Sequence, residues 1–400
     1  MLKFCIGRED LLKPLEQVSG PASASPQGDT ITLNVLLRVQ RVNCNIENLQ
    51  DNSLKDANFK LQMICSDTEI EMISEVGLFS DEIEEGETTV NVGKLVEIIK
   101  SLPDATYIKF CLDANNLIIQ TELNNFALAT KPAEQFPSIE SLETLFELKI
   151  KHKELLNLMR TTAFSIAVEN YRVHFKGMRF EISGKTLNIY TADGHRLSMQ
   201  KGQLEEEVVF QESYKDNGFI FPKKGVTEVI KLLDLRKTSE DIVTLSLSKN
   251  SLKTTIDGIS LVSKLIDGKY PDVSNVIPRN CSRFIVIDRE SLMKTIRRVS
   301  ILCNSKNNAM EFLVKSGKLT IKTRNSQHEE AKEKVEIEYQ GDDFELAYNS
   351  SYFMDICKVV NTQKLKISMP VDSNAAMVEG VPVGDEEPSF ARYIVSRVVL

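Results

Sequence analysis

The sequence predicts an α+β fold built from three similar units. Two helical signals recur in the same order three times along the 400 residues. Their spacing of about 130 residues suits a small domain and is too long for a solenoid repeat. Runs that alternate apolar and polar residues lie between the helical signals and indicate β-strands. Strands with two helices in each unit are typical of an α+β layer domain.

The first helical signal follows a short apolar strand that opens with phenylalanine in every unit. Its copies begin at residues 8, 153 and 289, and the three phenylalanines are Phe4, Phe146 and Phe284. In the first and third copies the apolar residues recur at helical spacing, as Leu11, Leu15, Val18 and as Leu292, Ile296, Val299. We expect this stripe to pack on the sheet of its own unit.

The second helical signal is a tetrapeptide that pairs an acid with a lysine three residues later. Its copies occupy 97–100, 228–231 and 355–358, and each follows a strand-like run, at 88–92, 218–221 and 344–348. The first copy places Leu95, Ile98 and Leu102 on its predicted buried face.

The strands and the domain boundaries follow from alternation and turn residues. Residues 60–65, 186–190 and 318–322 alternate apolar and polar side chains. Phe136-Pro137 and Tyr270-Pro271 close the first two units, and Pro278 leads into the third. The predicted domains are therefore 1–140, 141–279 and 280–400.

Composition excludes several classes of protein. No apolar run approaches the roughly 20 residues needed to span a bilayer, and charge interrupts the amino terminus too early for a secretion signal. The 7 cysteines form no CxxC pair, which favours reduced thiols in the cytoplasm. The 4 histidines are dispersed, so neither a metal site nor a cofactor is expected.

The net charge is −8, yet the charges are unevenly distributed. Basic residues outnumber acidic ones on the predicted helices, while acids cluster at 81–85, 205–207 and 384–387. Solvated helix faces would explain any one helix. A shared basic surface across all of them would bind a polyanion in one orientation. Without a base-reading motif, contacts to duplex DNA would be non-sequence-specific. The basic positions on these faces are Lys13, Lys94, Lys100, Lys223, Lys224, Lys231, Lys294, Arg297 and Arg298, with Lys151, Lys153, Arg160, Arg236 and Lys358.

Two polar motifs could suggest catalysis. Gly184-Lys185-Thr186 lacks the earlier glycine of a P-loop, because Arg179 occupies that position, and it is interpreted as a hairpin turn. Asp193-Gly194-His195-Arg196-Leu197 could hold a general base with an orienting carboxylate. No nucleophile elbow or second histidine accompanies it, so a hydrolase is the weaker interpretation and no catalytic residue is assigned.

Several stretches in order resemble the bacterial DNA polymerase III beta subunits, the sliding clamps, along essentially the whole chain. They include Leu11-Leu12-Lys13-Pro14-Leu15, Asp193-Gly194-His195-Arg196-Leu197, Pro222-Lys223-Lys224-Gly225-Val226, the segment 263–272, Ile301-Leu302-Cys303-Asn304 and Tyr393-Ile394-Val395.

The resemblance implies three DNA-clamp domains, each with two helices on antiparallel sheets, arranged as half of a ring. Two chains would close the ring head to tail around duplex DNA, with Ile301 and Leu302 at the dimer interface. Implied partners are the DNA polymerase III catalytic subunit, clamp-loader subunits, other polymerases and repair proteins that carry a short apolar peptide. No membrane partner is implied. A monomeric three-repeat scaffold that binds proteins but not DNA is the alternative.

The resemblance also implies a peptide-binding pocket between the second and third domains, an apolar groove with a polar rim. Its residues here are Phe175, Gly194, His195, Arg196, Leu197, Pro271, Val276, Tyr352, Ile394, Val395, Val398 and Leu400. By the same resemblance, Arg172 and His174 are candidates for contacts with DNA.

Overall fold

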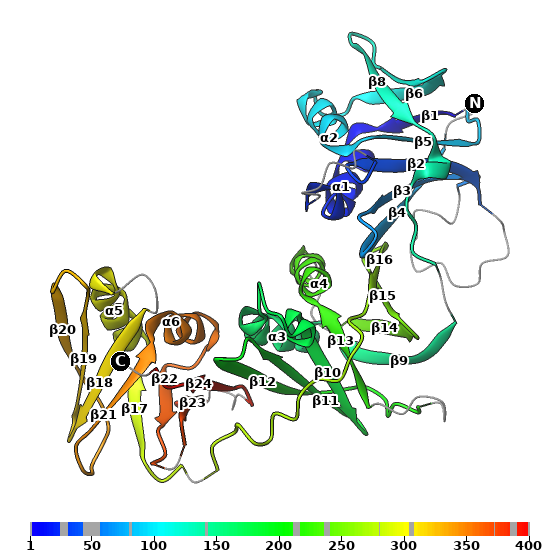
Figure 1. Cartoon of the computed structure of the whole chain (residues 1–400). Coiled ribbons are helices and arrows are strands. Elements are labelled where there is room, and N and C mark those ends of the chain that lie inside the picture. The colour runs from blue at the N-terminus through cyan, green and yellow to red at the C-terminus, as the bar shows by residue number, and fades with distance from the viewer. Residues whose placement is uncertain are drawn as a thin grey trace. The chain divides into compact units, whose positions relative to one another are not determined.

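The computed structural model describes residues 2–24, 31–42, 57–79, 82–140, 143–210, 217–235, 241–279, 281–303, 308–371, 373–384 and 390–398. Across these residues the order strand, helix, three strands occurs six times (Figure 1). Each predicted unit therefore contains this pattern twice, which explains why two helical signals recur in each. The α+β prediction is confirmed.

The chain divides into two compact units. The first unit comprises Met1–His152, Val208–Tyr214 and Thr227–Leu265, and the second comprises Lys153–Glu207, Lys215–Val226 and Ile266–Leu400. Neither unit coincides with one predicted domain, because strand pairing crosses the predicted boundaries. The boundaries near 140 and 280 stay a prediction.

The first unit contains one sheet of 12 strands, and neighbouring strands pair in antiparallel fashion. Within this sheet strand β4 pairs with β16, with Met72 opposite Leu261. Helices α1 (Arg8–Val18) and α2 (Val92–Ser101) belong to this unit. In sheet order the strands are β1 (Lys3–Gly7), β6 (Tyr107–Asp113), β7 (Asn116–Gln120), β8 (Asn125–Lys131), β5 (Gly86–Asn91), β2 (Asn34–Arg41), β3 (Phe59–Ser66), β4 (Ile70–Leu78), β16 (Ile259–Lys264), β15 (Ser251–Ile256), β14 (Ile242–Ser248) and β9 (Thr144–Lys151).

The second unit contains a sheet of 8 strands and a sheet of 4 strands. Helices α5 (Arg289–Val299) and α6 (Ser350–Val359) lie side by side in it (Figure 1). The larger sheet runs β13 (Gly218–Pro222), β10 (Gly177–Ser183), β11 (Thr186–Ala192), β12 (Arg196–Gln203), β24 (Arg392–Ser396), β23 (Ala375–Val381), β22 (Lys364–Ser368) and β17 (Phe284–Asp288). The smaller runs β20 (Glu330–Glu336), β19 (Lys318–Arg324), β18 (Ala309–Lys315) and β21 (Phe344–Asn349).

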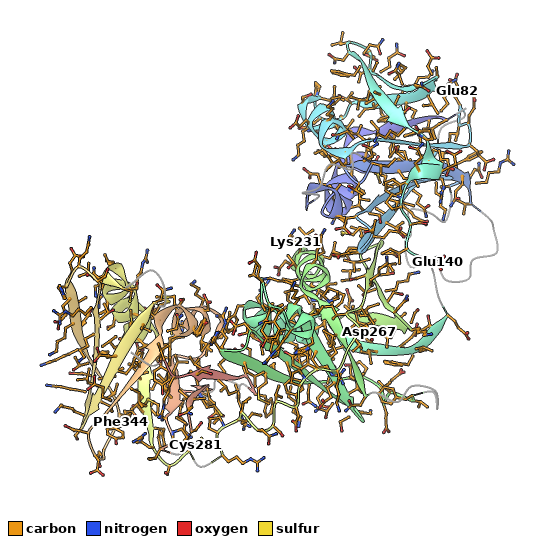
Figure 2. All side chains as sticks on the ribbon, viewed as in Figure 1. Glu82, Glu140, Lys231, Asp267, Cys281 and Phe344 are labelled. Carbon is orange, nitrogen blue, oxygen red and sulfur yellow. The ribbon has the colours of Figure 1, made fainter. Side chains whose placement is uncertain are left out.

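Two further helices cross the division between the units. They are α3 (His152–Thr162), which lies mostly in the second unit, and α4 (Lys223–Leu235), which lies mostly in the first. Figure 2 shows Lys231 on α4. Of the helices in the described residues, none is long and apolar enough to cross a membrane.

Helices α2 and α5 begin where a polar side chain satisfies a backbone N–H that has no partner within the helix. Asn91 accepts from the Lys94 N–H at 3.0 Å at the start of α2. Asp288 accepts from the Ser291 N–H at 2.8 Å at the start of α5. The capping side chain directly before each of these two helices thus fixes where the helix starts.

The predicted apolar stripes are buried, with one correction. Leu11, Leu15 and Val18 are buried on α1, as are the three apolar residues predicted on α5. On α2 the buried residue is Ile99, whereas Ile98 is only half-buried. Leu95 and Leu102 are buried as predicted, so the correction is confined to this one position, and Val92 adds to the same inward face.

Candidate functional site

A tight turn joins β11 to β12 and carries the motif Asp193 to Leu197. The Asp193 Oδ1 accepts from the backbone N–H of His195 at 2.9 Å and of Arg196 at 3.0 Å. Gly194, which lies between Asp193 and His195, has a φ of 97°, a backbone conformation that residues with a Cβ rarely adopt. No atom would lie within 4 Å of a Cβ built there, so the backbone conformation, rather than space, requires glycine.

The Arg196 guanidinium connects two helix-bearing segments that lie far apart in sequence. It donates to Asp193 Oδ2 at 2.9 Å, to Asp355 Oδ2 at 2.8 Å and to the Phe164 carbonyl at 2.8 Å. The Arg196 side chain is only 14% exposed, so these charge-assisted bonds lie partly outside solvent. Arg196 therefore fixes the position of β12 relative to α6.

The Tyr352 ring on α6 stacks against the same guanidinium. The Arg196 Cζ lies 4.6 Å from the Tyr352 ring centroid, within the range of a cation–π contact. Burial, and secondarily the Asp193 charge, raise the pKa of the Tyr352 hydroxyl. The ring is half-buried. The contact with Arg196 therefore holds the Tyr352 ring in place beside the turn.

An apolar floor lies beside this turn. Strand β12 pairs with β24, with Leu197 opposite Ile394, and both side chains are buried. They belong to one hydrophobic cluster with Phe175 and Tyr270. The structure therefore places Leu197, Ile394 and Phe175 together, as the predicted pocket requires.

The carboxy-terminal segment is held against the same junction. The Ser396 N–H donates to the His195 carbonyl at 2.9 Å, and the Val398 N–H donates to the Ala347 carbonyl at 2.9 Å. Val398 is half-buried. This places Val398 beside β21, which leads into the helix that carries Tyr352.

The other predicted pocket residues are distributed around this core. Pro271 and Val276 are exposed on segment 268–277, which contributes Val273 and Ile277 to the cluster instead. Val395 points into the separate core of the third predicted domain. Leu400 lies outside the described residues.

The turn does not have the geometry of a catalytic dyad. The Asp193 carboxylate is occupied by the His195 and Arg196 backbone N–H groups and by the Arg196 side chain. The Asp193 carboxylate therefore stabilises the turn rather than orienting the exposed His195 imidazole. Gly184-Lys185 is a hairpin turn between β10 and β11, as predicted. Across the described ranges, no three metal-ligating side chains gather.

In the first unit the predicted DNA-facing cations lie on three helices. Lys13 is exposed on α1 and Lys94 on α2. Lys100 pairs with Glu16 at 2.6 Å, and Lys231 pairs with Glu228 at 2.9 Å. Glutamates thus neutralise part of the predicted basic faces.

In the second unit the cations are also partly paired. Lys294 pairs with Glu290 at 3.0 Å, and Arg298 pairs with Glu333, whereas Arg297 is exposed. Lys223 and Lys224 are half-buried at the start of α4.

The loop that precedes β10 carries the two remaining candidates for DNA contacts. Arg172 is exposed and stacks on the Tyr171 ring at 5.2 Å. His174 packs edge-on against Phe175 at 4.5 Å, and burial lowers its pKa. A neutral imidazole held in an aromatic cluster is a weaker phosphate ligand than exposed Arg172.

The two predicted interface residues follow α5 in a short 3-10 turn, Ser300–Leu302. Ile301 is 76% exposed and Leu302 is half-buried. An isolated exposed isoleucine is common on protein surfaces. The placement therefore leaves Ile301 available for a contact with another chain.

Sequence reasoning missed the residues that anchor Arg196. Asp355 is the acid of the third copy of the repeated tetrapeptide, in which the other two copies have Glu97 and Glu228. The aspartate in place of glutamate at this position is the sequence feature that could have indicated a separate role for Asp355. The Phe164 carbonyl carries no side-chain signature at all.

Comparison with known proteins gives a consistent result along the chain. The sequence matches the N-terminal, central and C-terminal domains of the DNA polymerase III beta subunit over residues 2–140, 149–272 and 274–387, respectively. It is 31% identical to a beta sliding clamp of Vibrio cholerae, with all of both chains covered. It is 30% identical to that of Escherichia coli, with 98% of this chain and 99% of the relative covered.

Solved structures agree. A crystal structure of the DNA polymerase sliding clamp from Pseudomonas aeruginosa with ligand is 31% identical, covers all of both chains and superposes with a TM-score of 0.86. The sliding clamp of the same organism bound to griselimycin, also 31% identical with all of both chains covered, has a TM-score of 0.85. The chain belongs to the DNA polymerase III beta subunit family, the bacterial sliding clamps.

Proposed function

We propose that this protein is a DNA sliding clamp without catalytic activity that acts in the cytoplasm. Two chains would form a head-to-tail ring around duplex DNA, with Ile301 and Leu302 at the interface. The ring would tether the DNA polymerase III catalytic subunit and, in turn, clamp-loader subunits, other polymerases and repair proteins. The match to all three family domains carries this proposal.

The proposed DNA contact is weak and independent of sequence. Exposed Lys13, Lys94, Arg172 and Arg297 could reach phosphates, while several neighbouring cations are paired with acids. Phosphate contacts carry no base information and permit sliding. A closed ring cannot leave sideways, so its residence on DNA would not depend on tight contacts.

The proposed partner pocket is the Arg196 junction. Phe175, Leu197 and Ile394 would form its apolar floor, and Tyr352 with Val398 would form its rim. Such a groove accepts a short apolar anchor from a peptide, because burial of the anchor drives binding and rim groups fix its orientation.

The tethering mechanism is tested by DNA topology. The clamp is loaded by its clamp loader onto nicked circular DNA, and half of the sample is then linearised. We expect the linear DNA to lose the clamp by sliding from its ends and the circle to retain it. Equal loss from both forms contradicts a topological tether. A solution mass equal to the 45.1 kDa of one chain, instead of twice that value, favours the monomeric scaffold.

The pocket is tested by removing residues 398–400. We expect loss of binding to a labelled peptide from the polymerase subunit of the same genome, with an unchanged solution mass. Phe390→Ser is the matched control, because Phe390 is an exposed apolar residue just before β24. Unchanged peptide affinity in the deletion variant would rule out this pocket.

A further inference from the structure

The turn between β3 and β4 repeats the geometry of the turn beside the proposed peptide pocket. The Asp67 Oδ1 accepts from the backbone N–H of Glu69 at 3.0 Å and of Ile70 at 2.8 Å. Asp193 makes the same two bonds, at 2.9 Å and 3.0 Å, in the turn between β11 and β12. The residue after each aspartate has a positive φ, of 77° and 97° respectively. Asp67 and Asp193 therefore occupy equivalent positions.

The strand that pairs with each turn is also held in the same way. Strand β16 pairs with β4 in the first unit (Figure 1), and β24 pairs with β12 in the second. At the end of β16, the Lys264 N–H donates to the Glu69 carbonyl at 2.9 Å. At the end of β24, the Ser396 N–H donates to the His195 carbonyl at the same distance. The β4–β16 junction and the β12–β24 junction thus share one backbone frame.

This frame fixes which side chains correspond in the two junctions. Glu71 lies four residues after the turn aspartate and opposite Val262. Leu197 lies four residues after its own turn aspartate and opposite Ile394. The β12–β24 junction presents two buried apolar side chains, on which the proposed pocket is built. The β4–β16 junction instead places a carboxylate at the position of Leu197.

A connecting segment in which an aromatic residue precedes proline covers each junction. At the β4–β16 junction, Phe136 is 8% exposed and packs in a cluster with Ile64 and Ile73. At the β12–β24 junction, Tyr270 is 7% exposed and packs in the cluster that contains Leu197. The two junctions therefore resemble each other in their cover as well as in their frame.

Glu71 fastens the segment that covers the β4–β16 junction. Its Oε2 accepts from the backbone N–H of Ile139, which lies in that segment, at 3.1 Å, and Glu71 is only 6% exposed. Burial raises the pKa of Glu71, while the Ile139 N–H and the Arg38 charge offset this rise in part. An apolar anchor seated over this carboxylate would bury it further, which is unfavourable for a polar or charged group.

The segment that covers the β12–β24 junction leaves room beneath it. A cavity of about 720 Å³ lies between this segment, 268–277, and strands β10 and β11, and Tyr270 lines it. The Ser274 N–H donates to Asp272 Oδ1 at 2.9 Å, a bond that the segment makes with itself. Leu197, at the position of Glu71, has no side-chain acceptor for a segment N–H. This junction therefore keeps space beside its apolar floor.

We propose that Glu71 is a specificity-determining residue that excludes partner peptides from the β4–β16 junction. The chain builds the same frame in both units, and one side chain decides which of the two accepts an apolar anchor. This inference rests on the proposed function, because it takes the β12–β24 junction to be the peptide pocket. It gives Glu71 the role of closing a site.

The test exchanges the side chains of the two junctions. Glu71→Leu removes the bond to Ile139 and supplies the floor residue of the other junction. Glu71→Gln is the matched control, because its carboxamide oxygen can still accept from the Ile139 N–H. Leu197→Glu is the reciprocal variant, with Leu197→Met as its control of similar volume, and it tests the same argument if Glu71→Leu does not fold.

The probe is a fluorescein-labelled peptide from the polymerase subunit of the same genome, and anisotropy titrations give Kd and the number of sites per chain. Wild-type protein and Glu71→Gln should bind one peptide per chain, whereas Glu71→Leu should bind two. Amide exchange at Ile139 should accelerate about ten-fold in Glu71→Leu, the range of one hydrogen bond, and stay unchanged in Glu71→Gln. Leu197→Glu should weaken peptide binding by about ten-fold or more, and Leu197→Met should keep it.

One site per chain in Glu71→Leu, or two in the wild-type protein, overturns the role of Glu71 and leaves the proposed pocket intact. Unchanged exchange at Ile139 in Glu71→Leu also overturns it. Undiminished binding by Leu197→Glu, where deletion of residues 398–400 still abolishes binding, does the same. Failure of the wild-type protein to bind any peptide overturns the proposed pocket itself.

Discussion

Replacing Arg196 by methionine tests whether one guanidinium holds the junction between β12 and α6. Methionine keeps an apolar stem that can still pack on Tyr352, but it removes every donor. Asp193, Asp355 and the Phe164 carbonyl then each lose a bond of 2.8–2.9 Å. The local structure should open more often, because these bonds link segments 159 residues apart.

The expected magnitude follows from the exposure of the partners. Breaking a fully buried charge pair costs about 3–5 kcal/mol. Here the Asp193 and Asp355 side chains are 18% and 30% exposed, so water can replace part of the lost bonding. Asp355 also keeps Lys358 at 3.3 Å. We therefore expect a local loss of about 2 kcal/mol, which is roughly a 30-fold change in an equilibrium constant.

Native-state amide exchange measures this loss locally, which suits a chain of several domains that need not unfold in one step. Exchange in β12 and in the first turn of α6 should accelerate roughly 30-fold in Arg196→Met. Arg392→Met is the control, because Arg392 is 50% exposed and pairs with Glu379 on the surface. Such pairs contribute under about 1 kcal/mol. Equal acceleration in both variants would refute the special role of Arg196.

Two further predictions concern stability elsewhere. Asp288→Ala should lower the free energy of unfolding by about 1 kcal/mol near neutral pH by removing the N-cap of α5. Because the Ser291 N–H holds the folded pKa of Asp288 below its usual value, this contribution is present above the unfolded pKa and is lost as pH falls through the folded one. Urea unfolding should show the difference shrinking in acid, and a constant difference would contradict it. Gly218→Ala should cost more than about 3 kcal/mol, because its Cβ would lie 1.8 Å from the Phe180 carbonyl oxygen. Gly93→Ala, whose nearest neighbour is the Asn91 side chain at 3.5 Å, should instead stabilise α2 by about 0.5–1 kcal/mol. Melting temperatures that move in the same direction for both variants would refute the steric argument.

Parts of the candidate site could be predicted from sequence, and parts could not. The motif Asp193 to Leu197 was a visible polar cluster, and the resemblance indicated Tyr352 and Ile394 as its neighbours. Alternation at 186–190 predicted the strand that leads into this motif, and the tetrapeptide at 355–358 predicted the helix that carries Tyr352. The cavity beside Tyr270 was not predictable, because its walls come from two strands and a later segment whose approach no local pattern encodes. The role of Asp193 as a turn anchor likewise became visible only with its hydrogen bonds.

By itself, the sequence determined the repeated α+β pattern, the helix starts and most inward faces, because each depends on residues only a few positions apart. Asn91 and Asp288 illustrate this, since each caps the helix that follows it at once. Tertiary structure alone decided that Arg196 meets Asp355 and that β4 pairs with β16. Those contacts join distant segments, and they depend on how whole strands and helices pack. The same packing buries Ile99 in place of Ile98, since neighbouring positions on a helix point about 100° apart.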